Sequence, residues 1–241
     1  LYTFRPRLCG AFCILEFRMY DLRLGDCLEV MRSMPDCSVD SIVTDPPYGM
    51  SFQSQWVPAE RRKAKIAGDG KPFIWWLAEA HRVLRDGGAM VCFTDWRNQE
   101  TWRIAIECAG FDIRSHCVWD RVGHGMGDLS AAFAPRHDVF WFATKGRFKF
   151  PGKRPVSVLR HQRPASHHSP HPTRKPVELM LELVRSVTPP GGVVFDPFVG
   201  SGSTGEAAAI GGYAFKGCEL SPEYFDLAKA NIEQAHQAQV D

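Results

Sequence analysis

The 241-residue chain lacks several patterns that assign proteins to common classes. None of its eight cysteines forms a Cys-x-x-Cys pair, although Cys9 and Cys13 lie close together, so the sequence predicts no zinc site. No apolar run approaches the length of a membrane span, which predicts no membrane partner. The pattern Gly-x-x-x-x-Gly-Lys-Ser/Thr is absent, which excludes a P-loop. Scattered cysteines in a chain of this length are typical of a reduced, cytoplasmic protein.

Acidic side chains are missing from one long stretch. Between Val139 and Val177 there is no Asp or Glu, and Phe148 and Phe150 lie among the basic residues. The net charge of the chain is only +2, so positive charge is concentrated here. Such a segment is typical of contact with nucleic-acid phosphates, with a solvated basic loop as the alternative. Its Lys and Arg residues are Lys145, Arg147, Lys149, Lys153, Arg154, Arg160, Arg163, Arg174 and Lys175.

Short apolar runs alternate with amphipathic stretches along the chain. Runs such as 40–44 and 193–196, each closed by turn residues, predict buried strands. Helices are predicted after Pro72, where Asp86-Gly87-Gly88 would end the helix, and after Pro176 and Pro222. Roughly seven strands alternating with helices predict an α/β fold, with a Rossmann-like, mostly parallel sheet covered by helices on both faces.

The predicted domain covers residues 19–241. Residues 1–18 show no clean periodicity and are interpreted as an N-terminal extension. Residues 50–70 are polar and irregular, with several Lys and Arg residues. A loop of this length inside a domain is usually functional or disordered.

Asp45-Pro46-Pro47-Tyr48 follows the predicted strand at 40–44. In open α/β sheets, ligands bind just outside the carboxyl ends of the strands. The prolines remove two backbone donors and leave carbonyl acceptors. A carboxylate, free carbonyls and an aromatic ring together suit a flat group that carries N–H donors. A simple turn is the alternative.

A glycine-rich loop occurs late in the chain, where Gly200-Ser-Gly202-Ser-Thr-Gly205 lies between a predicted strand and a helix. With Glu219 at the end of the next strand, this spacing alone allows a dinucleotide site. However, Asp196 precedes the glycines, and its carboxylate suits an ammonium group better than a pyrophosphate. A loop that only permits close helix–strand packing is the alternative.

Taken together, the motifs at 45–48 and 196–202 resemble those of the amino-group DNA methyltransferases, which use S-adenosylmethionine as cofactor. The order, with the catalytic motif first and the cofactor loop last, is similar to the permuted β group of that family. The segments 171–176, 119–121 and 143–146 also resemble family segments. The resemblance implies a class I methyltransferase fold and DNA as the partner.

The resemblance assigns a cofactor role to each matching position. Glu219 matches the acid on the ribose hydroxyls. Asp26, with the backbone at Cys27, matches the position near the adenine, while Thr173 and Lys175 flank the methionine portion. The complete set of implied cofactor-binding residues is Asp26, Cys27, Thr173, Lys175, Asp196, Phe198, Gly200, Gly202, Ser203, Thr204 and Glu219.

Asp45, Pro46, Pro47 and Tyr48 match the family's catalytic loop. The exocyclic amino nitrogen of adenine or cytosine is a poor nucleophile, because its lone pair is delocalised into the ring. Asp45 and the Pro46 carbonyl can accept its two N–H bonds, which frees the lone pair to attack the sulfonium methyl in line. The target atom is inaccessible in a duplex, so the base is expected to flip out and stack on Tyr48.

The resulting hypothesis is a DNA methyltransferase acting on adenine N6, since the family uses Asp-Pro-Pro-Tyr mostly for adenine. N4-cytosine is the first alternative; a cytosine-C5 enzyme is excluded because no Pro-Cys pair occurs. RNA or protein amino-methylation, a non-catalytic DNA-binding module and a dinucleotide-dependent oxidoreductase are further alternatives. Target recognition is expected within 145–170, with 50–70 as a DNA-facing loop. The recognition site, the oligomeric state (monomer or homodimer) and the role, including restriction–modification, are left open.

Overall fold

Strands and helices alternate along the part of the chain that the computed structural model describes, residues 20–48, 72–125, 127, 129–163 and 174–239. The strands are β1 (Tyr20–Leu24), β2 (Val39–Thr44), β3 (Leu84–Thr94), β4 (Asp112–Asp120), β5 (His137–Thr144), β6 (Val158–Arg160), β7 (Val193–Asp196) and β8 (Ala214–Glu219). The helices are α1 (Cys27–Arg32), α2 (Leu77–Val83), α3 (Gln99–Cys108), α4 (Val177–Val187), α5 (Ser203–Gly211) and α6 (Pro222–Gln237).

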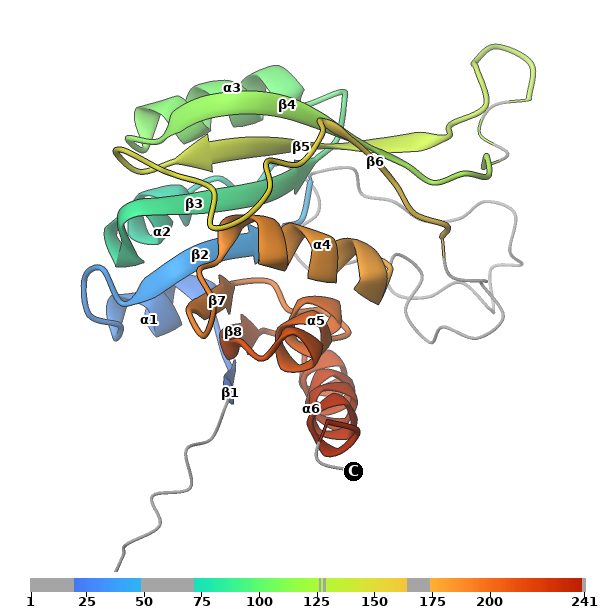
Figure 1. The fold of residues 1–241 in the computed structure, drawn as a ribbon. Coiled ribbons are helices and arrows are strands. Elements are labelled where there is room, and N and C mark those ends of the chain that lie inside the picture. Colours follow the sequence, from blue (N-terminus) through green and yellow to red (C-terminus); the bar gives the residue numbers. More distant parts are fainter. Residues whose placement is uncertain (1–19, 49–71, 126, 128, 164–173, 240–241) are drawn as a thin grey trace, which may run out of the picture.

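All of these strands join one sheet, in the order β1-β8-β7-β2-β3-β5-β4-β6 (Figure 1). Neighbouring strands are parallel, except that β5 lies antiparallel to both β3 and β4. The predicted α/β fold with a mostly parallel, Rossmann-like sheet is therefore confirmed. The expected number of roughly seven strands was too low. The additional strand is the three-residue β6, which pairs with β4 and lies in a segment whose sequence showed no strand pattern.

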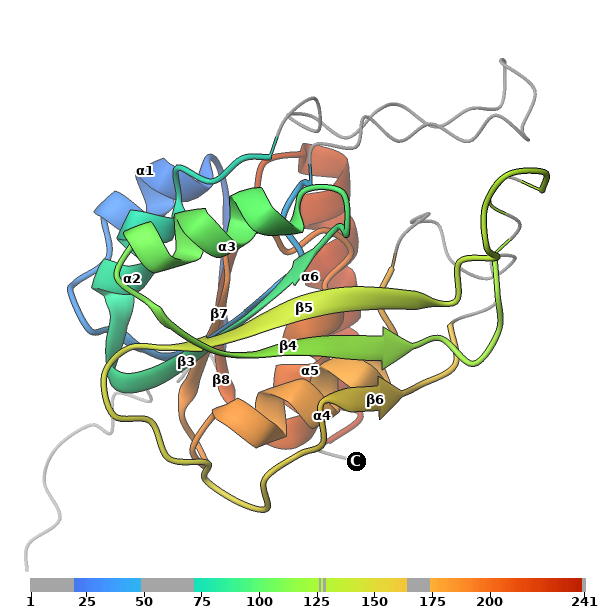
Figure 2. The same ribbon diagram turned by 90° about the horizontal axis from the view of Figure 1, so that it is seen from above.

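Helices cover both faces of the sheet (Figure 2). Successive residues of a strand point to opposite faces. In β2, Ile42 faces a core formed with α1, α2 and α3, which contribute residues such as Met31, Leu77 and Trp102. Val43 faces the second core, formed with α4, α5 and α6. Burial on both faces explains why the central strands are almost continuously apolar.

Two predicted boundaries around α2 were wrong. The helix begins at Leu77 rather than directly after Pro72. The Asp86-Gly87-Gly88 stretch does not end this helix but lies within β3. Backbone pairing explains the difference: the Gly87 N–H donates to the Lys145 carbonyl (2.8 Å), and the Lys145 N–H donates to the Gly88 carbonyl (3.0 Å).

The sheet divides the basic segment into two parts. Because β5 runs against its neighbours, Lys145 follows it at the edge where the parallel strands begin. The chain returns along β6, and only from Arg160 onwards does it reach the edge where the parallel strands end. Phe148 and Phe150, which the sequence grouped with the charges, pack on Phe142 of the core, Phe148 edge-on and Phe150 stacked.

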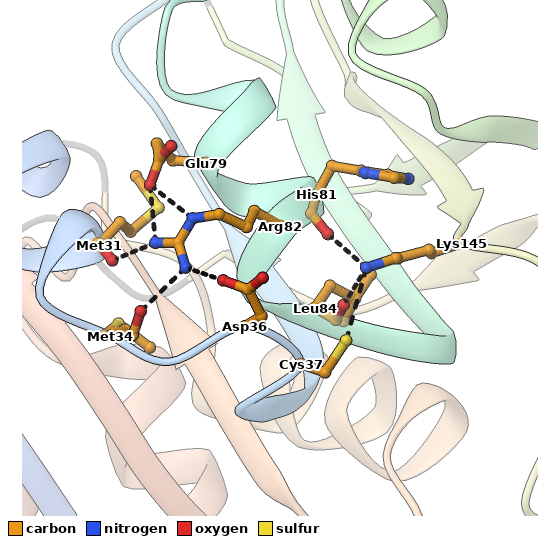
Figure 3. Close-up of polar contacts among 9 residues, drawn as sticks. All are labelled: Met31, Met34, Asp36, Cys37, Glu79, His81, Arg82, Leu84 and Lys145. Atoms are coloured by element: carbon orange, nitrogen blue, oxygen red, sulfur yellow. Dashed lines mark hydrogen bonds and ion pairs between the residues drawn. The ribbon is translucent and has the colours of Figure 1, made fainter.

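Arg82 of α2 fastens the turn that leads into β2 (Figure 3). Its guanidinium donates to the carbonyls of Met31 (2.7 Å) and Met34 (2.9 Å), at and just after the end of α1. It also pairs with Asp36 (2.5 Å) and Glu79 (2.7 Å). One cation thus bonds two main-chain carbonyls at the end of α1 and in the turn that follows it.

Lys145 makes a similar contact at the end of α2, beside the same turn (Figure 3). Its ammonium donates to the carbonyls of His81 (3.0 Å) and Leu84 (2.8 Å) and lies 3.8 Å from the Cys37 sulfur. This lysine therefore has a structural role, although the sequence grouped it with the DNA-facing charges.

Replacing Arg82 with Met should lower the free energy of unfolding by about 2–3 kcal/mol, because buried carbonyls would lose a charged donor. The matched control is Arg103→Met in α3, where the guanidinium pairs with the exposed carboxylates of Glu100 and Glu107. That change should cost clearly less, because solvent screens exposed ion pairs. Urea unfolding measures both values, and equal losses would contradict the role of Arg82.

Candidate active site

The site lies where β2 and β7 end side by side. From β7 the chain continues through α5 to β8, whereas from β2 it continues through α2 to β3, on the other side of the pair. Ile42 of β2 is in register with Phe195 of β7, so Asp45 and Asp196 come at the ends of neighbouring parallel strands. Ligands of open α/β sheets bind at such a switch point. The fold thus brings together the two motifs that the sequence singled out.

Asp196 is buried, with 2% of its surface exposed. One carboxylate oxygen accepts hydrogen bonds from the Thr44 hydroxyl (2.7 Å) and the Phe198 N–H (3.0 Å). The other accepts from the Thr204 hydroxyl (2.6 Å). Burial raises the pKa of Asp196 to about 6, although these three donors oppose the shift. The carboxylate joins the end of β2, the glycine loop and the start of α5.

The glycine loop requires glycine at specific points. Gly200 and Gly202 have φ values of +55° and +93°, in the left-handed region that L side chains rarely adopt. A Cβ atom on Gly202 would also lie 3.0 Å from the backbone of Ala228 in α6. Ser203 and Thr204 begin α5 and are buried, so the loop passes directly into a packed helix.

Glu219, at the end of β8, holds this loop in place. Its carboxylate accepts from the N–H groups of Gly200 (2.8 Å) and Ser221 (2.9 Å), and burial raises its pKa. Its carbonyl accepts from the N–H of Gly25 (2.9 Å), which brings the start of α1 close. There Asp26 caps the helix by accepting from the N–H of Leu28 (2.8 Å).

Cys27 begins α1 next to this cap. Its side chain is buried, and burial together with the charge of Asp26 raises the pKa of its thiol to about 12. The thiol is therefore neutral and packs as a small apolar group. The structure thus places Asp26, Cys27, Glu219 and the glycine loop at one edge of the sheet.

The loop at 45–48 is held by the ammonium of Lys175, a residue that the resemblance assigned to the methionine portion of the cofactor. The Lys175 ammonium lies 2.5 Å from one carboxylate oxygen of Asp45, 3.2 Å from the Tyr48 hydroxyl and 4.6 Å from the centre of the Phe93 ring. The Tyr48 hydroxyl donates to the other oxygen of Asp45. Burial raises the pKa of Asp45, and the ammonium of Lys175 opposes that shift. Both oxygens of Asp45 therefore have donors within the protein.

The rest of the loop is fixed by its backbone. Pro46 is buried, and Pro47 and Tyr48 are half-buried. The Asn98 side-chain amide, just before α3, donates to the Tyr48 carbonyl (3.0 Å). Thr173, the remaining predicted site residue, lies outside the described residues.

Residues 39–230 match the N6_N4_Mtase family model, described as DNA methylase. The chain belongs to this family. The resemblance to S-adenosylmethionine-dependent DNA amino-methyltransferases is thereby confirmed. The family includes both N6 and N4 methylases, so membership leaves the target base unassigned.

Individual methylases and solved structures are similar over most of their length. "Putative methylase YubD" of Escherichia coli (strain K12) is 34% identical over 89% of this chain and 90% of its own. "DNA adenine methyltransferase YhdJ" of the same organism is 26% identical, over 88% of this chain and 82% of its own. The crystal structure of the M1.HpyAVI–SAM complex has a TM-score of 0.69 at 24% identity, covering 88% of this chain and 98% of that one.

Other classes of site are not found in the described part of this methylase. Within it, no group of three or more His, Cys, Asp or Glu side chains could hold a metal ion. None of the helices described there is long and apolar enough to cross a bilayer.

Sequence reasoning missed several residues of the site. Thr44 was visible only as a hydroxyl at the end of an apolar run, although it is fully buried. Asn98 showed no signal beyond a helix start. Arg174, grouped with the DNA-facing charges, pairs with Glu206 of α5 at 2.5 Å. Each depends on a contact distant in sequence.

The pH dependence of stability should reveal the burial of Asp196. Its pKa is near 6 in the folded methylase and 3.8 when unperturbed, so its stabilising contribution is complete below about pH 4 and is lost as the pH rises through 6. In Asp196→Asn the amide can still bond both threonine hydroxyls but does not titrate, so the variant does not lose this stability as the pH rises. Between pH 4 and 7, urea unfolding should show the wild type losing about 2–3 kcal/mol relative to the variant. Parallel pH profiles would contradict this assignment.

Proposed function

We propose that this methylase transfers a methyl group from S-adenosylmethionine to the N6 atom of a flipped adenine in DNA. The supporting observation is the direct link between the two motifs, in which Thr44 before the catalytic loop donates to Asp196 before the cofactor loop. A cofactor held by the glycine loop would face Asp45 across neighbouring strand ends. This proposal implies DNA as the partner and the cytoplasm as the compartment.

The residues around the glycine loop fit S-adenosylmethionine chemically. Glu219 and Asp26 supply carboxylate acceptors suited to ribose hydroxyls and adenine. Gly200 and Gly202 expose backbone without side chains, and Asp196 provides negative charge for an ammonium group. Phe198, whose ring packs edge-on against Trp76, would form an apolar wall. When bound, the cofactor supplies an electrophilic methyl on a sulfonium.

Asp45 and the Pro46 carbonyl would hold the target amino group. Asp45 already accepts two donors, Lys175 and Tyr48, so the amino group has to replace one of them. A carboxylate whose pKa is raised by burial is also better suited to take up the proton that the methylated nitrogen loses. Tyr48 would then be available to stack on the base.

Lys175 and the segment before α4 complete the proposed site. The ammonium lies among Asp45, Tyr48 and Phe93, where an anionic group of the cofactor could draw it away from Asp45. In addition, Thr173 is proposed to flank the methionine portion of the cofactor, with Ser203 and Thr204 at the start of α5. Recognition of the DNA sequence is proposed for the part of 145–170 that reaches the carboxyl ends of the parallel strands. The segment 50–70, which lies outside the described residues, is proposed to share this role.

Asp45→Ala should abolish methyl transfer and leave the cofactor site intact. We expect transfer of labelled methyl to DNA to fall on the order of 10³-fold or more, because the variant lacks the acceptor for the amino group. Calorimetry should show S-adenosylmethionine binding unchanged within a few fold. Asp112→Ala, at the start of β4, is a control in which an exposed carboxylate is removed. Loss of cofactor binding in Asp45→Ala would contradict the separation of roles.

The target base is tested by sequencing that detects modified bases, on DNA from cells that express the methylase. We expect N6-methyladenine at a defined sequence, and none in cells expressing Asp45→Ala. N4-methylcytosine instead would refute the adenine assignment and keep the enzyme class. If purified protein binds S-adenosylmethionine but labels no DNA, the proposed function fails.

A further inference from the structure

Trp96 is a large apolar side chain exposed beside the catalytic loop. β3 ends at Thr94, Asp95 is buried, and Trp96 is then 65% exposed. Thr44 is in register with Cys92, so Asp45 lies next to Phe93. Trp96 follows Phe93 by three residues and begins a turn, so the two α-carbons are at most roughly 10 Å apart.

The exposed ring is held rather than loose. The Arg97 guanidinium lies 4.7 Å from the centre of the Trp96 ring. Arg97 is itself bound to the buried Asp95 carboxylate, through its N–H (3.1 Å) and its guanidinium (3.2 Å). A cation over an indole face stabilises the ring's position, and burial of Asp95 fixes the cation. The indole of Trp96 is therefore held in place by Arg97, although most of its surface is exposed to water.

The same segment is tied to the catalytic loop, since the amide of Asn98 donates to the Tyr48 carbonyl (3.0 Å). Residues 95–98 and the loop that carries Asp45 are therefore fixed relative to one another. Among the described residues, no comparable contact joins the segments of the exposed Trp75 and Phe133 to the loop at 45–48. This contact distinguishes Trp96 from a solitary surface residue, which would need no explanation.

Building on the proposed function, we infer that Trp96 inserts into the DNA duplex and fills the space that the flipped base leaves. Extrusion of a base breaks its stacking on both neighbours, and an inserted aromatic ring replaces part of that loss. The ring has the flat apolar surface that stacking on a base requires, and it lies close to the point where the flipped base would be held. Trp96 is thus a positioning residue that acts on the duplex, whereas Asp45 acts on the amino group.

The experiment compares two substrates in Trp96→Ala, Trp96→Phe and the wild type. One is a duplex with a sequence found to be modified, and the other has the same target adenine opposite an abasic site, where it is already unpaired. On the normal duplex, Trp96→Ala should lower kcat/KM about tenfold or more, with Trp96→Phe in between. On the abasic substrate the two variants should approach the wild type. Ile104→Ala removes another exposed apolar side chain, on α3, and is the control; it should match the wild type on both substrates.

A fluorescence measurement gives an answer without turnover. With 2-aminopurine in place of the target base, wild-type protein should raise the fluorescence as the base unstacks, and Trp96→Ala should raise it less. An equal loss of activity on both substrates, or no loss on either, overturns the role of Trp96. The second outcome is also the one expected if the indole binds a protein partner instead of DNA. If the wild type itself methylates neither substrate, the proposed function fails, and the inference fails with it.

Discussion

The site depends on one buried carboxylate. Asp196 accepts hydrogen bonds from Thr44, Thr204 and Phe198, so one side chain joins a strand end, a helix start and the loop between them. Burying a carboxylate is unfavourable unless its oxygens are paired, which explains why polar side chains converge here within an otherwise apolar core. The two halves of the site are thus fixed to one another by hydrogen bonds to one shared group.

The carboxylate of Asp45 lies in a different environment. It is half-buried and paired with Lys175 and Tyr48, so the groups that are proposed to receive the base satisfy one another in this structure. An arrangement of this kind avoids an isolated charge in a water-poor place. Under the proposed function, binding of the base would exchange donors on Asp45, with the incoming amino group replacing Lys175 or Tyr48.

Local signals predicted much of this molecule. The glycines at 200 and 202 were recognised because positive φ angles restrict the residue type, and Asp45 because it follows a buried strand. Contacts across the chain were not predictable, since Thr44 and Asp196 are 152 residues apart and Asp45 and Lys175 are 130 apart. The packing of Phe148 was not predictable for the same reason: charge and aromatic content do not reveal that the chain following antiparallel β5 returns to the core.

The strand order also bears on how the protein is made. β1 and β2 follow each other in the chain, yet β8 and β7, which come from its last third, lie between them. A ribosome therefore exposes the catalytic loop long before the strands that complete the sheet exist. Until then β1 has no described neighbour, and β2 keeps one edge unpaired, which is an aggregation risk. Assembly of the sheet is thus a late event in synthesis, and a nascent chain truncated before β7 lacks the glycine loop and Glu219, which are proposed to hold the cofactor.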